Sequence, residues 1–180
     1  MSAIVVYEDA EYVNLLPLVY WRTACELRLG FDTLLDKMRA AWSDQAIHLF
    51  VRPYLAEVIA ERYGPVVNQP VRQEALFLNG RLLVGQAFHA PLNTVLELDG
   101  QVAAVRLDAE RAARMSPEIM LDAAKLAAAL EGLPREPLKA PDLAILRYPW
   151  DFVHANEREL HRQWSTQVRR GSTEGHVYEG

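Results

Sequence analysis

The sequence predicts an α/β fold with a mainly parallel sheet. Two observations support this class. The first half alternates short apolar runs, typical of buried strands, with segments in which apolar residues repeat at helical spacing. The second half contains two apolar runs separated by Asp99-Gly100, a pair that favours a tight hairpin because both turn positions need positive φ. We therefore expect a β-hairpin insertion at residues 94–107 in this sheet.

Strands and helices alternate through the first half. Leu34, Leu35 and Met38 repeat at helical spacing in the first helix. Pro53 suits the first position of the second helix, and Gly64 suits its end. The predicted order is strand, helix, strand, helix, strand, over residues 3–7, 33–42, 46–51, 53–64 and 74–78.

The segment between the first strand and the first helix is long and lacks sustained periodicity. Residues 10–30 include Pro17 and Gly30, which interrupt regular structure. About twenty residues without regular structure are uncommon in a compact domain unless the loop is functional. We therefore expect this loop to contribute to a binding site.

The second half adds a helix after the hairpin. Ser116 suits the N-cap and Pro117 the first helical position, and Gly132 suits the end of a helix over residues 117–130. Three prolines then predict a loop over residues 133–141.

The last elements are a short strand and a helix. The strand is expected at residues 143–146, and Pro149 opens a helix over residues 150–164. The tail from Arg169 is rich in glycine, serine and charge, so we expect it to be mobile.

Composition excludes several classes of protein. The chain has 180 residues, 51% of them hydrophobic, and a net charge of −5, which fits one globular domain and argues against intrinsic disorder and against a nucleic-acid-binding surface. Cys25 is the single cysteine, so an intrachain disulfide is excluded. The longest apolar run, residues 15–21, is too short to cross a membrane. Because no signal peptide is recognisable, we expect a cytoplasmic protein with no membrane partner.

Polar residues follow two of the predicted strands. Glu8 and Asp9 follow the first, and open α/β sheets bind ligands beyond the carboxyl ends of their strands. These carboxylates could hold Mg²⁺, or they could be two solvated loop acids. Asn79, Gly80 and Arg81 follow the third strand, where Asn79 or the Gly80 backbone could contact a base or sugar, or form a simple turn.

The long loop carries two arginines close to a glycine. Arg22 and Arg28 could bind phosphate, since guanidinium groups donate in pairs and Gly30 would allow close backbone approach. Alternatively, Glu26 pairs with an arginine and folds the loop down.

Three parts of the chain together resemble the N-terminal domain of the divergent GlmU-family sugar nucleotidyltransferases, in the sugar-1-phosphate nucleotidyltransferase superfamily. The first joins Glu8-Asp9 to the NLLPL run at residues 14–18 and the ELRLG run ending at Gly30. The other two are FLNGRLL at residues 77–83 and YPWDFVHAN at residues 148–156. The last of these is the most specific.

The resemblance implies a Rossmann-like nucleotidyltransferase three-layer sandwich over residues 1–168. Such domains join a nucleoside triphosphate to a sugar 1-phosphate with Mg²⁺ and release pyrophosphate. In full-length relatives a left-handed β-helix follows. We therefore expect residues 169–180 to lead toward such a region, through which a homo-oligomer could form.

The resemblance also implies roles for individual residues. Arg22 and Arg28 would clamp the triphosphate, and Arg81 would supply a positive charge in place of a metal ion. The expected nucleotide- or sugar-binding residues are Asn14, Glu26, Gly30, Asn79, Gly80 and Asn156. The expected metal ligands are Glu8, Asp9 and Asp151.

The chain departs from the superfamily pattern at its metal site. The glycine-rich G-x-G-T-R-M signature is absent, and Arg81 and Ile145 stand where the two metal-binding aspartates would be. Two hypotheses follow. The domain is a nucleotidyltransferase with a divergent active site, or it is a catalytically lapsed domain that binds a nucleotide or nucleotide sugar and supports a C-terminal acyltransferase-like β-helix.

Overall fold

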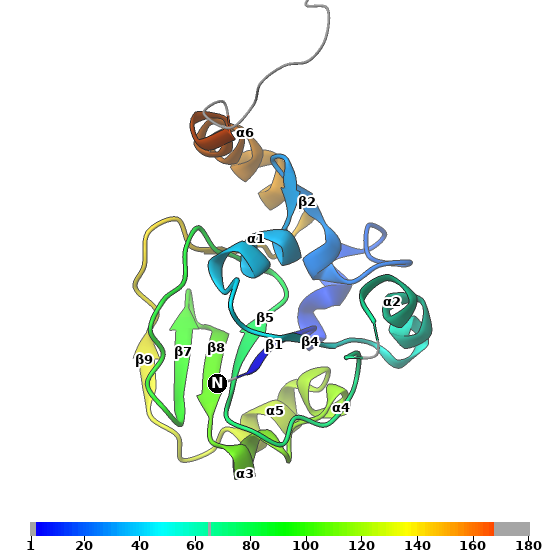
Figure 1. Cartoon of the computed structure of the whole chain (residues 1–180), viewed down its shortest axis with the longest axis vertical. Helices are drawn as coiled ribbons and strands as arrows, with labels where there is room; N and C mark the ends of the chain where they lie inside the picture. Colours follow the sequence, from blue (N-terminus) through cyan, green and yellow to red (C-terminus); the bar gives the residue numbers. More distant parts are fainter. Residues whose placement is uncertain (1–2, 65, 168–180) are drawn as a thin grey trace, which may run out of the picture.

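A six-stranded mixed sheet forms the centre of the computed structural model, which describes residues 3–64 and 66–167 (Figure 1). Its strand order is β4 (Ile47–Phe50), β1 (Ala3–Tyr7), β5 (Ala75–Asn79), β8 (Gln101–Leu107), β7 (Thr94–Leu98) and β9 (Arg135–Pro137). β1 pairs in parallel with β4 and β5, and β9 pairs in parallel with β7. Within this sheet β8 runs antiparallel to both of its neighbours, β5 and β7. The predicted α/β class with a mainly parallel sheet is confirmed.

Helices cover both faces of the sheet, which confirms the three-layer arrangement. All five residues of β1 are buried, as expected for a strand covered on both faces. Ile4 and Val6 pack with α1 (Leu34–Ala41) and α2 (Ala56–Tyr63). The alternate residues Val5 and Tyr7 pack with side chains from the other layer, which contains α3 (Ala109–Ala112), α4 (Pro117–Met120) and α5 (Ala123–Ala129).

Local signals set several boundaries where the sequence predicts them. Asp99 and Gly100 both have positive φ, 51° and 75°, and join β7 to β8 as the expected hairpin. The Thr33 side chain accepts a hydrogen bond from the Asp36 N–H and caps α1. A short 3₁₀ helix, η3 (Pro53–Leu55), precedes α2, which ends at Gly64 with φ 87°.

The predicted single helix over residues 117–130 is wrong, because the chain breaks between α4 and α5. Asp122 adopts an extended conformation, and its carboxylate accepts hydrogen bonds from the N–H groups of Ala124 and Lys125. A short acidic side chain that bonds nearby backbone N–H groups ends one helix and starts another.

The predicted loop over residues 133–141 contains β9, which the sequence analysis missed. This strand lies at the sheet edge, where β7 is its one partner among the described residues. An edge position tolerates Pro137, which has no N–H to donate. Pairing with a strand some forty residues earlier decides this element, and local propensity does not reveal it.

The long loop after β1 is built mainly from 3₁₀ turns. It contains η1 (Ala10–Leu15) and η2 (Ala24–Glu26), and ends in a small hairpin of β2 (Arg28–Leu29) and β3 (Asp32–Thr33). Its buried apolar side chains form a third core with Leu146 and Phe152. The loop is therefore packed onto the end of the chain.

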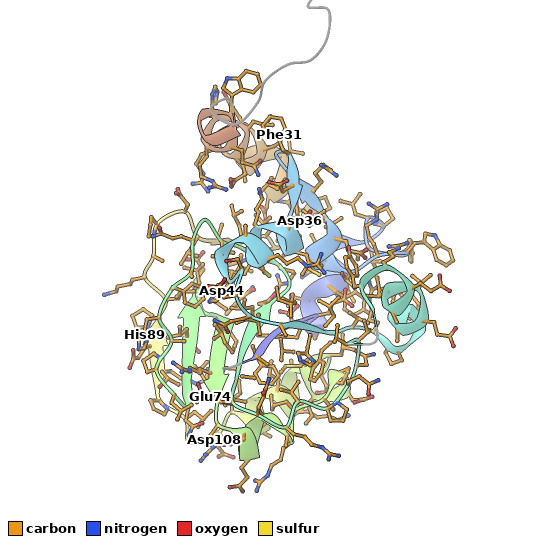
Figure 2. The ribbon with its side chains drawn as sticks, viewed as in Figure 1. Phe31, Asp36, Asp44, Glu74, His89 and Asp108 are labelled. Atoms are coloured by element: carbon orange, nitrogen blue, oxygen red, sulfur yellow. The ribbon has the colours of Figure 1, made fainter. Side chains whose placement is uncertain are left out.

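The last helix, α6 (Pro149–Gln167), rests on this hairpin and extends away from the sheet (Figure 1). It follows β10 (Ala144–Ile145), which pairs with β6 (Leu82–Leu83). The Asn156 side chain accepts from the Gly30 N–H at 2.8 Å, and the Gln163 side chain accepts from the Phe31 N–H at 2.7 Å. Figure 2 shows Phe31 beside α6. The expected tail at residues 169–180 lies outside the described residues.

None of the helices within the described ranges is both long and apolar enough to cross a membrane.

Replacing Gly30 with alanine should destabilise the fold more than the same change at Gly132. Both glycines have positive φ, 68° and 75°, so each alanine is strained by about 1–2 kcal/mol. At Gly30 the new Cβ would also collide with the Gln163 side-chain amide, whereas nothing lies within 4 Å at Gly132. Urea unfolding should show Gly30→Ala losing at least about 1 kcal/mol more, since the Gln163 hydrogen bonds are disturbed. Equal losses of unfolding free energy in the two variants would mean that the contact between Gly30 and α6 contributes nothing to stability.

Candidate functional site

The carboxyl ends of β1, β4 and β5 meet at one edge of the sheet. Tyr7 at the end of β1 lies beside Phe50 on one side and Asn79 on the other. The residues that follow these three strands therefore come together. They form two buried ion pairs, one on each side of β1.

Glu8 and Arg52 form the first pair, and each side chain is only 2–3% exposed. The Arg52 Nε donates to Glu8 Oε2 at 3.1 Å, and Nη2 donates to Oε1 at 3.2 Å. The backbone N–H groups of Arg52 and Ala24 also donate to this carboxylate. Burial raises the pKa of Glu8, while the Arg52 guanidinium opposes the rise. Both carboxylate oxygens have protein donors.

Arg52 also holds the long loop against the sheet. Its Nη2 donates to the carbonyl oxygens of Val19 at 2.7 Å and Arg22 at 2.8 Å. Its guanidinium lies 4.2 Å from the centre of the Tyr12 ring, within cation–π range. Arg52 is not among the site residues predicted from the sequence. It follows β4, so the strand-end reasoning that selects Glu8 and Asn79 applies to it equally.

Asp9 and Arg81 form the second pair, and Arg81 is 1% exposed. The Arg81 Nε donates to Asp9 Oδ1 at 3.0 Å, and its Nη2 donates both to Asp9 Oδ2 and to Gln101 Oε1. The Asn79 amide adds a hydrogen bond to Asp9 Oδ2 at 2.8 Å. A charge that would otherwise be costly to bury is thus neutralised.

Gly80 allows the backbone to approach β1 closely in this turn. Its N–H donates to the Tyr7 carbonyl oxygen at 2.7 Å, and a Cβ at this position would lie only 3.0 Å from the same oxygen. Burial raises the pKa of the Tyr7 phenol, whose hydroxyl donates to the Val102 carbonyl. Gly80 therefore sets the close approach of this turn to the end of β1, and Asn79 holds Asp9 there.

A cavity of about 310 Å³ opens beside the second ion pair. Asp9, Gln101 and Arg135 supply polar groups to its wall, and α4 and α5 supply an apolar wall. Arg135 also pairs with Glu97. Its full lining is Tyr7, Asp9, Ala10, Glu11, Gln101, Val102, Met120, Ala123, Leu126, Ala127, Leu130 and Arg135. An apolar cavity with a few converging polar groups is the usual form of a small-molecule site. The sequence analysis did not select Gln101 or Arg135.

The carboxylates expected to hold Mg²⁺ are arranged for other partners. Glu8 and Asp9 each accept from an arginine, and Asp151 accepts from the N–H groups of Arg147 and Tyr148 at 2.7 and 2.9 Å. Within residues 3–64 and 66–167, no three His, Cys, Asp or Glu side chains are grouped to hold a metal ion. This donor set does not fit a metal ion. Magnesium dependence stays a prediction.

The remaining candidates in the long loop differ in their side-chain contacts. Glu26 pairs with Arg62 of α2, with 2.8 Å between Nη1 and Oε1, and closes a capping box with Thr23. The Asn14 amide donates to Glu11 at 2.6 Å. The Arg22 side chain is exposed, with no hydrogen bond or ion pair to any described residue.

Arg28, Gly30 and Asn156 gather elsewhere, at the junction of α6 with the β2–β3 hairpin. Arg28 is exposed and donates to the Phe31 carbonyl, and Gly30 donates to Asn156. These three residues thus lie apart from the candidates at the sheet edge, which are Glu8, Asp9, Asn79, Gly80 and Arg81.

The comparisons with known proteins concern almost the whole chain. A family model described as "Sugar nucleotidyl transferase" matches residues 4–170. No curated protein sequence matches the chain.

Solved structures share the fold at low sequence identity. A CTP:phosphocholine cytidylyltransferase from Streptococcus pneumoniae aligns with TM-score 0.52 and 9% identity, over 88% of this chain and 98% of that one. A Bacillus anthracis protein provisionally assigned as a glucose-1-phosphate thymidylyltransferase, solved in complex with a sucrose, aligns with TM-score 0.53 and 8% identity, over 89% and 95% of the two chains. These similarities confirm the nucleotidyltransferase fold.

Arg52→Ala should lower the free energy of unfolding by about 3–5 kcal/mol, because it leaves the Glu8 carboxylate buried without its partner. The matched control is Arg62→Ala, since Arg62 is half exposed and its pair with Glu26 should contribute only about 0–1 kcal/mol. Urea unfolding followed by circular dichroism measures both. Equal losses for the two variants would show that the buried pair is not the stronger constraint.

The Cys25 thiol should be inert in the folded protein. Burial raises the pKa of Cys25 to about 12, so the thiol stays protonated at pH 8, and it is only 2% exposed. A disulfide reagent at pH 8 should react at least about a hundredfold faster in urea than in buffer, since the unfolded thiol has an ordinary pKa. Rapid labelling of the native protein would contradict the burial.

Proposed function

The chain belongs to the sugar nucleotidyl transferase family, and we propose that it transfers a nucleotidyl group from a nucleoside triphosphate to a sugar 1-phosphate. A phosphate oxygen of the sugar 1-phosphate forms a bond to the α-phosphorus, and the bond from that phosphorus to the bridging oxygen of pyrophosphate breaks. The observation behind this proposal is the family match over residues 4–170. The sequence motifs of this chain further favour assignment to the divergent GlmU-like branch of the family.

We place the sugar 1-phosphate in the cavity beside Asp9 and Arg81. A volume of about 310 Å³ suits one small substrate. Leu126 and Met120 offer apolar surface to the ring, the Gln101 amide can bond its hydroxyl groups, and Arg135 can pair with its phosphate. The exposed guanidinium of Arg22 on the long loop remains the proposed contact for the triphosphate.

A second candidate function is binding of a nucleotide sugar without turnover. The two ion pairs at the strand edge favour it, because Arg52 and Arg81 occupy the carboxylates that could otherwise hold a metal ion. Phosphoryl transfer depends on positive charge that offsets the charge developing on the transferred group. In this alternative the fold persists as a binding domain.

Ala127→Trp should block the cavity, because this exposed α5 residue lines it and a large ring would fill it. Ala128→Trp is the matched control: Ala128 is the next residue of the helix, is also exposed and does not line the cavity. We expect pyrophosphate release from a panel of nucleoside triphosphates and sugar 1-phosphates to fall at least about tenfold in Ala127→Trp only, which corresponds to about 1.4 kcal/mol.

The assay is run with Mg²⁺ and with a chelator, alongside thermal shifts for each substrate. Stabilisation by a nucleotide sugar without any pyrophosphate release would favour the binding domain over the enzyme. Equal effects of the two tryptophan variants on pyrophosphate release would show that the substrate does not bind in this cavity.

A further inference from the structure

One face of α6 leaves large apolar side chains in water, although the other face of the same helix is packed. Phe152 and Gln163 on the packed face are buried against the long loop. On the free face, Trp150 is 55%, Val153 72% and Trp164 62% exposed. Large apolar side chains gathered on one exposed face of an element are typical of a protein–protein contact.

The residues of this face follow the spacing of a coiled-coil seam. The seam residues are Trp150, Val153, Glu157, Leu160 and Trp164, which are separated by alternating steps of three and four positions. This spacing places their side chains in one stripe along the helix, as at positions a and d of a heptad. A stripe of this kind packs against a second helix.

A groove lies beside the stripe, between α6 and the tip of the β2–β3 hairpin. Its volume is about 700 Å³. Phe31 at the hairpin tip and Trp164 both line it, with their ring centres 6.4 Å apart, and Val153 and Leu160 add to its apolar wall. The same face therefore offers projecting rings and a hollow, which is the combination that a self-complementary contact uses.

The exposed apolar area is close to what a pair of copies needs. Since a tryptophan side chain has a surface of about 250 Å², the exposed parts of Trp150, Val153 and Trp164 together amount to roughly 400 Å² on each chain. A symmetric contact uses this area twice, and Phe31 and Leu160 add to it. The total then approaches the roughly 1,000 Å² expected of a specific interface.

The charged side chains on this face favour one orientation of two copies. In a parallel pair, Glu157 would lie opposite Glu157 of the second copy, and like charges repel there. In an antiparallel pair with its two-fold axis between positions 158 and 159, Glu157 lies beside His161 of the second copy. An imidazole N–H can donate to that carboxylate. The same register places Val153 opposite Trp164 of the second copy.

The position of α6 in the fold also suits an antiparallel pair. The helix extends away from the sheet, with its first residues near the body of the domain (Figure 1). Antiparallel pairing therefore places the two sheets at opposite ends of the helix pair, where they do not collide.

We propose that α6 pairs in antiparallel with α6 of a second copy of this chain, through the stripe from Trp150 to Trp164 and the groove beside Phe31. Each interface residue is then used twice, as in the two-fold dimers that are the commonest closed assemblies. This contact lies within the described domain, so it differs from the oligomer expected through a region beyond residue 168. It does not depend on the proposed reaction.

Sedimentation velocity of the full chain over about 1–100 μM tests the proposal, because interfaces of this size commonly have micromolar Kd values. We expect a dimer. Val153→Glu and Trp164→Glu should each raise its Kd at least about tenfold, since each places a charge in the apolar contact. The matched controls are Val58→Glu on α2 and Trp21→Glu in the long loop, which replace exposed residues of the same types outside α6 and its groove. Both controls should leave Kd unchanged, and circular dichroism checks that every variant is folded.

A charge exchange tests the antiparallel orientation. Glu157→Lys and His161→Glu should each weaken the dimer at least about fivefold, and the double variant should recover most of the affinity, because the opposite charges again face each other. A parallel pair would show no recovery.

Four results would overturn the proposal. They are a monomer throughout the concentration range, an assembly larger than a dimer, a dimer that Val153→Glu and Trp164→Glu leave unchanged, and a double variant that does not recover. None of these results bears on pyrophosphate release, so the proposed function is tested separately.

Discussion

The buried ion pair between Glu8 and Arg52 is the constraint on which the candidate site depends. It joins the ends of two neighbouring parallel strands, and the same guanidinium bonds two carbonyl oxygens of the long loop. A buried charge is tolerated only where a partner and further hydrogen bonds satisfy it. The loop must therefore fold back over the strand edge to supply those carbonyls, and its apolar residues then pack as a separate core beneath α6.

The second pair gives the same edge an unusual electrostatic character. Arg81 is almost fully buried and is neutralised by Asp9, with support from Asn79 and Gln101. An arginine does not lose its proton, so its positive charge is permanent. A bound metal ion, by contrast, could dissociate and take its charge with it. The acids at this edge therefore serve to balance arginines.

Polar contacts from α6 explain why Arg28, Gly30 and Asn156 lie apart from the candidate residues at the sheet edge. Asn156 and Gln163 bond the backbone of the β2–β3 hairpin, and Lys37 pairs with Glu159 at 3.8 Å in the buried part of this interface. These contacts tie the last helix to the long loop and to α1, which contains Lys37. Arg28 and Gly30 consequently lie at the helix junction, although the sequence places them in the same loop as Arg22.

The sequence by itself determined the α/β class, the order of β1, α1, β4, α2 and β5, the Asp99-Gly100 hairpin and the start of the last helix, because periodicity, turn residues and caps act over a few neighbouring residues. It missed the break at Asp122, although that signal is also local. Only the tertiary structure decided that β9 joins the sheet, that Arg52 is the partner of Glu8, and that Asn156 serves the Gly30 backbone. Those contacts join residues between 40 and 126 positions apart. The sequence shows the charge and the hydrogen-bonding capacity of each side chain, but at such separations it does not show which residue is the partner.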